Sequence, residues 1–252
     1  MTALHHEIAG PDGAPVLLLG PSLGTTLRMW DGQLPLAERF RLVRFDHRGQ
    51  GASPLPPGPY EIADLGRDVL ELLDTLGLER VHYAGLSLGG MVGMWLGANA
   101  PDRIDHLVLL CTAAFMPPVS MWEQRIAIVS DAGSVEPIAD AVLDRWLTPE
   151  FRAADPEQAA SLRAMIAGSP PEGYAACCGA IARMDLRGEL ETVQAPTLVV
   201  SGAQDVATPV ADQELIAGAV AGARHSVVSP AAHLAAVEQP ERVNGLIAGF
   251  LG

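Results

Sequence analysis

Residues 81–100 read VHYAGLSLGGMVGMWLGANA, and this stretch decides the fold. The four residues Val81–Ala84 are typical of a buried strand, and the residues after Gly90 are typical of a helix with small residues on one side. Between them lies Gly85-Leu86-Ser87-Leu88-Gly89, a G-x-S-x-G pattern whose glycines let neighbouring backbone approach closely. A strand that passes through such a pattern into a helix turns sharply and exposes the hydroxyl of the serine. We therefore predict that Ser87 is a nucleophile, with the helix amino terminus favouring negative charge beside it.

Short apolar runs elsewhere resemble the run before Ser87. Most are continuous rather than alternating, which is typical of parallel strands that are buried on both faces. They are Leu4–Ile8, Pro15–Leu19, Arg41–Phe45, His106–Cys111, Pro196–Ser201 and His225–Val228. Helical patterns alternate with them at 66–79, 88–100 and 240–250. This alternation predicts an α/β fold with a mostly parallel, doubly wound sheet that helices cover on both faces.

The alternation of strands and helices stops between residues 115 and 190. That segment contains no convincing strand, but it has helix-start patterns at 120–123, 155–158 and 169–172 and a helical pattern at 135–147. We predict about four helices, inserted as a lid over the carboxyl edge of the sheet. Residues 1–114 and 191–252 then form the core, and residues 115–190 form the lid subdomain.

A serine hydroxyl needs a base, and the base needs an acid that orients it. In a fold of this kind the acid and then the base follow the serine along the chain. Asp205 lies in the loop directly after the run Pro196–Ser201. His233 lies in a later loop, just before the last helix, whereas His225 begins a strand and so lies at the wrong edge of the sheet. We predict that Asp205 is the acid and His233 the base.

Acyl transfer also needs two backbone N–H donors for the oxyanion. Leu88, directly after the candidate nucleophile, is one of them. The second should come from the loop at 20–25, in which Pro21 has no N–H to donate. Ser22 and Leu23 both remain candidates for this second donor.

Composition narrows the classes of partner. The chain has 252 residues, of which 49% are hydrophobic, and a net charge of −14 with no basic run. Nucleic acid and anionic membranes are therefore not expected partners, whereas a small molecule is, and a homo-oligomer is compatible with the sequence. Three cysteines without a disulfide pattern, no signal-peptide pattern and no membrane-spanning apolar run predict a cytoplasmic protein. No histidine has metal-ligand spacing, so no metal is expected.

Five segments along the chain are, in order, GPSLGTTLRMWDGQ, FDHRGQGAS, GPYEIADLGRDVLELLDTLGLER, GLSLGGMVGMWLGANAPDR and PEGYAACCGAIARMDLR. Together they resemble the 3-oxoadipate enol-lactonases of bacterial aromatic catabolism, which are members of the α/β-hydrolase superfamily. The last segment is the most specific to the family, whereas the triad is common to the superfamily. The hairpin strand with which relatives usually begin is missing, which implies seven strands.

By that resemblance the chain would be a carboxylic-ester hydrolase that opens β-ketoadipate enol-lactone to β-ketoadipate without a cofactor. Because this substrate carries a carboxylate, a cationic anchor is expected in the cleft. The candidate anchors are Arg28, Arg125, Arg145, Arg163 and Arg183. The candidate substrate contacts are Arg28, Trp30, Trp122, Trp146 and Arg183.

Two alternative functions remain open. The same triad would serve a carboxylesterase or a hydrolase that cleaves C–C bonds in ring-cleavage products. A small-molecule receptor built on a hydrolase scaffold is an alternative of another class, although a complete triad favours an enzyme.

Overall fold

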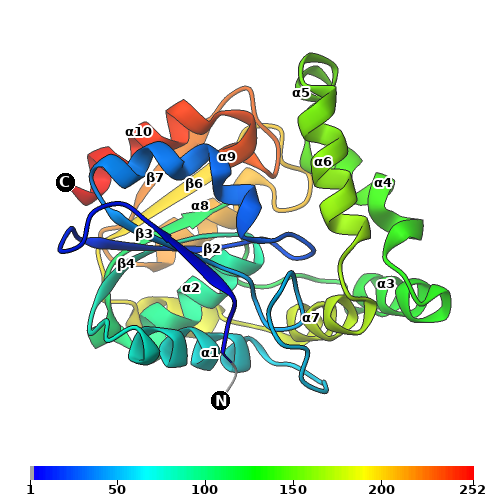
Figure 1. The fold of residues 1–252 in the computed structure, drawn as a ribbon, viewed down its shortest axis with the longest axis horizontal. Coiled ribbons are helices and arrows are strands. Elements are labelled where there is room, and N and C mark those ends of the chain that lie inside the picture. Colours follow the sequence, from blue (N-terminus) through cyan, green and yellow to red (C-terminus); the bar gives the residue numbers. More distant parts are fainter. Residues whose placement is uncertain (1–2) are drawn as a thin grey trace.

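A seven-stranded sheet forms the centre of the computed structural model, which describes residues 3–252 (Figure 1). The strands are β1 (His6–Ala9), β2 (Val16–Gly20), β3 (Arg41–Phe45), β4 (Val81–Leu86), β5 (Ile104–Leu110), β6 (Thr197–Gly202) and β7 (Arg224–Val228). Their order is β1-β3-β2-β4-β5-β6-β7, and only β1 pairs antiparallel with its neighbour. The predicted α/β fold with seven mostly parallel strands is confirmed. Every strand boundary lies within two residues of a predicted apolar run.

Helices cover both faces of this sheet (Figure 1). One face carries α1 (Ile62–Thr75), α2 (Leu88–Asn99) and α8 (Val210–Ala219). The other face carries the 3-10 helix η1 (Leu27–Glu38) with α9 (Ala235–Glu238) and α10 (Pro240–Leu251). Two short 3-10 helices are η2 (Pro101–Arg103) and η3 (Arg187–Thr192). Burial on both faces is why the central strands consist of continuous apolar residues.

Helix α1 begins earlier than its apolar pattern predicts. The pattern places the helix at 66–79, whereas the structure has Ile62–Thr75. The carboxylate of Asp64 accepts a hydrogen bond from the Glu61 N–H at 2.8 Å, as in a capping box, and this fixes the first turn. The helix ends before Gly77, whose φ of +66° suits glycine.

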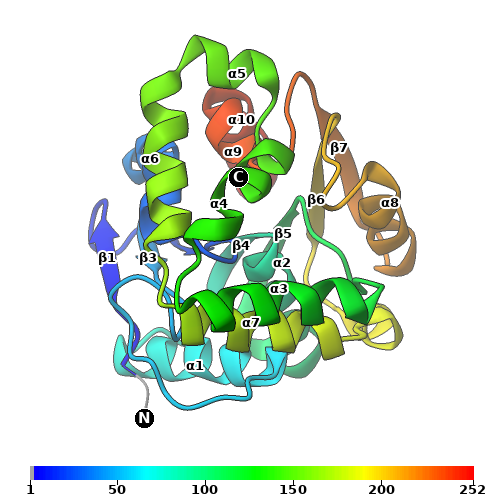
Figure 2. The same cartoon turned by 90° about the vertical axis from the view of Figure 1, so that its right-hand side faces the viewer.

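Five α-helices, rather than the predicted four or so, lie between β5 and β6. They are α3 (Val119–Ala132), α4 (Glu136–Trp146), α5 (Pro149–Ala154), α6 (Pro156–Ala167) and α7 (Pro171–Arg183). In Figure 2 these helices are nearest to the viewer, in front of the sheet. The additional helix α5 forms because the Thr148 hydroxyl accepts a hydrogen bond from the Phe151 N–H at 3.1 Å. Asp155 caps α6 as predicted, but α3 and α7 begin after Pro118 and Pro170 rather than after serine caps.

A buried carboxylate joins these inserted helices to the core. Glu238, at the end of α9, accepts hydrogen bonds from the N–H groups of Thr148 at 3.0 Å and Ala232 at 2.7 Å. The Thr148 hydroxyl donates to the same carboxylate. In addition, the Leu234 N–H donates to the Trp146 carbonyl at 3.0 Å. The loop after β7 is therefore hydrogen-bonded to the turn between α4 and α5.

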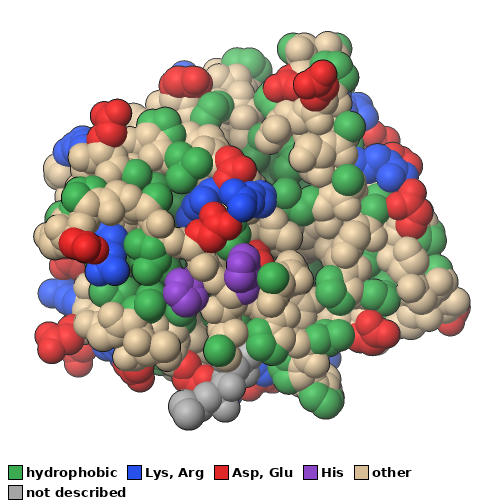
Figure 3. Space-filling model, viewed as in Figure 1, with side chains coloured by type: hydrophobic (Ala, Val, Ile, Leu, Met, Phe, Trp, Pro, Cys, Tyr) green, Lys and Arg blue, Asp and Glu red, His purple; other side chains and the backbone are tan. Residues whose placement is uncertain are grey.

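Within residues 3–252 no helix combines the length and the apolar character needed to cross a membrane. On the face drawn in Figure 3, basic side chains lie next to acidic ones and form no extended basic patch. Cys111, Cys177 and Cys178 are all free and buried, which confirms that they form no disulfide framework.

We predict that Glu238→Ala destabilises the protein. The substitution leaves two buried N–H groups and one hydroxyl without their acceptor, which should lower the free energy of unfolding by about 2–5 kcal/mol. Urea denaturation followed by circular dichroism measures this change. Glu241→Ala, at an exposed position of α10, is the matched control and should change stability by less than about 0.5 kcal/mol. Equal stability of the two variants would contradict the role of Glu238.

Candidate active site

Ser87 lies at a strained turn between β4 and α2. Its φ of 54° and ψ of −112° are rare for a residue other than glycine. The neighbouring glycines are sterically required, because a Cβ on Gly85 would lie 2.2 Å from the Gly89 carbonyl oxygen. A Cβ on Gly89 would in turn lie 2.1 Å from the carbonyl oxygen of Gly20 on β2. Glycine at these positions therefore lets α2 begin directly against the sheet, as the G-x-S-x-G pattern predicts.

Ser87 and His233 line one pocket at the carboxyl edge of the sheet. The space among the lining atoms, mouth included, is about 460 Å³. Most of its walls are apolar and come from the core and from the inserted helices. The apolar lining residues are Leu23, Met91, Met116, Met121, Trp122, Val142, Trp146, Ile181 and Ala207.

Asp205 holds the imidazole of His233. The Nδ1 atom of His233 lies 2.8 Å from Asp205 Oδ2, and both residues are buried. Asp205 also accepts hydrogen bonds from the N–H groups of Ala207 and Thr208 and from the Thr208 hydroxyl, at 2.8–3.0 Å. Burial on its own would raise the pKa of Asp205, but the charge and hydrogen bond of His233, together with Thr208, lower it. An ionised carboxylate keeps the proton on Nδ1 and leaves Nε2 free to act as a base.

The three side chains provide the groups that acyl transfer requires, namely a hydroxyl, an imidazole and a buried carboxylate. No hydrogen bond joins Ser87 Oγ to His233 within residues 3–252, and in unliganded sites such bonds are often long. The Trp146 ring packs against the His233 ring with 5.5 Å between centroids. His225, the rival base, instead lies 2.7 Å from the Ser201 hydroxyl, between β6 and β7.

The structure separates the two candidates for the second oxyanion donor. The N–H of Ser22 donates to Met29 Sδ at 3.1 Å and is therefore occupied. The N–H of Leu23 has no partner in the described part of the chain, and Leu23 lines the pocket. The N–H of Leu88, the first residue of α2, has no backbone acceptor there either. Leu23 and Leu88 are thus the two candidate donors.

The carbonyl of Pro21 holds the Leu23 loop beside α2. It accepts hydrogen bonds from the Gly89 N–H at 3.0 Å and from His47 Nε2 at 3.2 Å. His47 is buried in the loop after β3. Burial lowers the pKa of His47 to about 4, and the hydrogen bond to Pro21 only partly opposes this. A neutral imidazole is therefore part of the support beneath the candidate oxyanion donors.

Two arginines of the inserted helices reach the pocket, Arg125 from α3 and Arg145 from α4. Neither has an ion-pair partner in residues 3–252. Arg125 lies over the Trp122 ring, 5.1 Å from its centroid, and Arg145 donates to the Val206 carbonyl at 3.4 Å. Burial and the nearby charge of Arg125 lower the pKa of Arg145, the charge of Asp205 partly opposes this, and a guanidinium stays protonated. Two unpaired guanidinium groups beside an apolar pocket form a place for an anion.

Three predicted substrate contacts lie away from this pocket. Arg28 is exposed and paired with a glutamate of β1 at 2.8 Å. Arg183 forms an ion pair at 2.8 Å with a glutamate that precedes α1. Trp30 is fully buried in the core within η1. Trp122 and Trp146 do line the pocket, because α3 and α4 turn these side chains towards Ser87.

Known proteins resemble this chain over nearly its whole length. A family model described as alpha/beta hydrolase fold matches residues 15–240. The 3-oxoadipate enol-lactonase 2 of Acinetobacter baylyi is 37% identical over 243 residues, which cover 96% of this chain and 90% of that relative. A putative carbamate hydrolase RutD of Caulobacter sp. strain K31 is 30% identical over 260 residues, covering 98% of this chain and 95% of the relative. The crystal structure of the enol-lactonase from Burkholderia xenovorans LB400 has a TM-score of 0.97 at 39% identity, covering 99% of this chain and 96% of that one.

The burial of neutral His47 predicts sensitivity to acid. Its pKa is about 4 in the folded protein and returns to about 6.5 on unfolding. Between these values the unfolded chain binds more protons, so the free energy of unfolding should fall as the pH is lowered from about 7 to about 4. The part due to His47 is at most about 3 kcal/mol.

His47→Gln keeps a donor for the Pro21 carbonyl but does not titrate. Urea denaturation at a series of pH values should therefore show a flatter dependence for this variant than for the unmodified chain. His6→Gln, on the edge strand β1, is the control and should keep the original slope. The same slope in both variants would exclude His47 as the source of the acid sensitivity.

Proposed function

The chain belongs to the alpha/beta hydrolase fold family, and on this basis we propose that it hydrolyses β-ketoadipate enol-lactone to β-ketoadipate. The observation that carries the substrate is the pair Arg125 and Arg145, which form no ion pair in the described residues and line the pocket with Ser87. An enol-lactone with a carboxylate arm offers a reactive ester carbonyl and a negative charge to match these groups. The 37% identity with an enol-lactonase of Acinetobacter baylyi supports the same substrate.

The proposed reaction begins with attack of Ser87 Oγ on the lactone carbonyl carbon. His233 Nε2 accepts the hydroxyl proton, while Asp205 orients the ring and stabilises the imidazolium through Nδ1–H. The carbonyl oxygen becomes an oxyanion, to which the N–H groups of Leu23 and Leu88 donate. Since both donors are backbone groups held by the Pro21 carbonyl and by α2, they need no rearrangement as the charge develops.

Collapse of the tetrahedral intermediate breaks the ring C–O bond. The leaving oxygen takes the proton from His233 and departs as an enol, which tautomerises to the ketone. The former lactone carbonyl then remains as an ester on Ser87. Water gives a proton to His233 and attacks this ester, which releases the second carboxylate and restores the serine. The residues described supply every group that these steps use. We also propose a cytoplasmic location, as the free cysteines suggest.

Carbamates are the second candidate class of substrate, because the putative carbamate hydrolase RutD of the Caulobacter strain matches 98% of the chain. The same nucleophile and base attack a carbamate carbonyl, so the triad does not distinguish the two classes. The two pocket arginines can distinguish them, if one substrate carries a carboxylate and the other does not. Turnover of the substrate with the carboxylate should then depend on these arginines.

The decisive experiment mixes purified protein with the enol-lactone and follows loss of the lactone absorbance. We expect rapid loss with the unmodified chain, and a decrease in kcat of about 10⁴-fold or more for Ser87→Ala and about 10³–10⁴-fold for Asp205→Asn. Circular dichroism checks that both variants fold. Slow loss of the lactone together with fast hydrolysis of p-nitrophenyl esters would reject this substrate and retain an esterase. Binding without turnover of any ester or carbamate would favour the receptor.

Neutralising the pocket arginines should separate substrates by charge. Arg125→Gln and Arg145→Gln each remove a charge-assisted hydrogen bond, so kcat/KM for the carboxylate-bearing lactone should fall by about 10–100-fold. Hydrolysis of the neutral ester p-nitrophenyl acetate should change little. Arg163→Gln is the matched control, because Arg163 pairs with Asp140 and Glu136 outside the pocket. Equal losses on both substrates would show that the arginines do not bind the carboxylate.

A further inference from the structure

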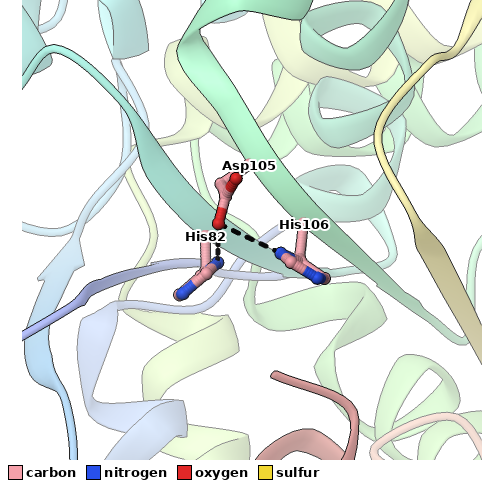
Figure 4. Close-up of side chains that lie close together, drawn as sticks. All are labelled: His82, Asp105 and His106. Atoms are coloured by element: carbon pink, nitrogen blue, oxygen red, sulfur yellow. Dashed lines mark hydrogen bonds and ion pairs between the residues drawn. The ribbon is translucent and has the colours of Figure 1, made fainter. Parts of the chain in front are cut away.

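A second group of ionisable side chains lies at the opposite edge of the sheet from the pocket. His82 is the second residue of β4, and Asp105 and His106 are the second and third residues of β5. These positions are at the amino ends of two parallel strands, whereas Ser87 follows the carboxyl end of β4. Figure 4 shows the carboxylate of Asp105 between the two imidazole rings.

A bulge in the pairing of β4 with β5 brings the three side chains together. The paired residues on either side of it are Val81 with Ile104 and Tyr83 with Leu107. One residue of β4, His82, therefore lies opposite two residues of β5. In a regular strand Asp105 and His106 would point to opposite faces, but a bulge breaks the alternation and re-aims a side chain. Both can then face His82.

One carboxylate oxygen faces both imidazoles. Asp105 Oδ2 lies 3.3 Å from His82 Nδ1 and 3.1 Å from His106 Nδ1, and the three atoms lie within 4.8 Å of one another. Two ligand atoms about 2.05 Å from a tetrahedral zinc ion are about 3.3 Å apart. The two distances from the Asp105 oxygen are thus close to those between ligand atoms of a zinc ion, and the two imidazoles offer ligand atoms within 4.8 Å of each other. These three residues are the one group of this kind in residues 3–252.

The surroundings favour binding of a cation. His82 is 8% exposed, and its Nδ1 atom has no hydrogen-bond partner in the described residues, because the contact with Asp105 is not aligned as a hydrogen bond. The other oxygen of Asp105 lies 3.3 Å from Arg80, an outer contact that orients the carboxylate. A shallow surface pocket lined by Arg80, His82 and Asp105 gives access from solvent.

We propose that His82, Asp105 and His106 form a zinc site with a fourth position open to water. Two imidazoles and one carboxylate suit Zn²⁺, whereas Mg²⁺ and Ca²⁺ prefer oxygen ligands alone. The site is remote from Ser87, so the ion takes no part in the attack of Ser87 on a substrate; it joins β4 to β5 where their pairing is irregular. The proposal goes beyond the hydrolase reaction and does not depend on its substrate. This proposal differs from the sequence-based prediction that no metal is bound. The ligands come from two separate strands, so they do not form a short motif with metal-ligand spacing in the sequence.

Calorimetric titration of the full chain with zinc chloride tests the site. We expect one zinc ion per chain with a micromolar Kd and an increase in Tm on binding. His106→Gln and Asp105→Asn change half-buried side chains and should each weaken binding by about tenfold or more. His6→Gln and Ser87→Ala should leave zinc binding unchanged, which separates this site from the pocket. Absence of zinc binding, or binding that both site variants retain, would overturn the proposal.

Measurements on the unmodified chain test the same site without depending on the folding of any variant. Zinc should shift the imidazole NMR signals of His82 and His106 before those of any other histidine. Substituted Co²⁺ should give the visible d–d bands of a tetrahedral ion. Shifts that first affect His233, or any histidine outside the bulge, would overturn the assignment.

Discussion

The backbone of Ser87 is the constraint on which the pocket depends. Ser87 alone connects β4 to α2. It therefore takes a positive φ, which by itself costs about 1–3 kcal/mol. Two neighbouring elements hold that turn in place. The Gly89 N–H is bonded to the Pro21 carbonyl, and the Thr112 hydroxyl donates to the Ser87 carbonyl at 2.8 Å. These two hydrogen bonds also bring the loop after β2 and the end of β5 next to the serine. The contacts that hold the strained turn therefore also assemble the site.

Features that follow from chain order were predictable from the sequence. Parallel strands all end at one edge of the sheet, so Ser87, Asp205 and His233 had to lie there once each was known to follow a strand. The structure brings Asp205 and His233 to 2.8 Å and places His233 in the pocket with Ser87. Continuous apolar runs sufficed for the strands, because burial on both faces leaves a strong local pattern.

Features that depend on tertiary partners were not predictable. Whether an arginine is available to a ligand depends on which carboxylate neutralises it, and the carboxylates closest to Arg28 and Arg183 are distant in sequence. A local signal did favour Arg125, since it lies three residues after Trp122 and therefore on the same face of a helix. The choice between Ser22 and Leu23 likewise required the sulfur of Met29 to be placed. The register shift that gathers His82 and Asp105 has no sequence signature at all.

The hydrogen bonds of Glu238 distinguish α4 from α3 among the inserted helices. Through Thr148 and the Trp146 carbonyl, the end of α4 is hydrogen-bonded to the loop that carries His233. Within residues 3–252, helix α3 forms no backbone hydrogen bond with that loop. A substitution at the end of α4 therefore also disturbs the loop that carries the base, whereas a substitution on α3 does not act on that loop through these hydrogen bonds. Of the two pocket arginines, Arg145 is on the helix joined to this loop and Arg125 is on the other helix.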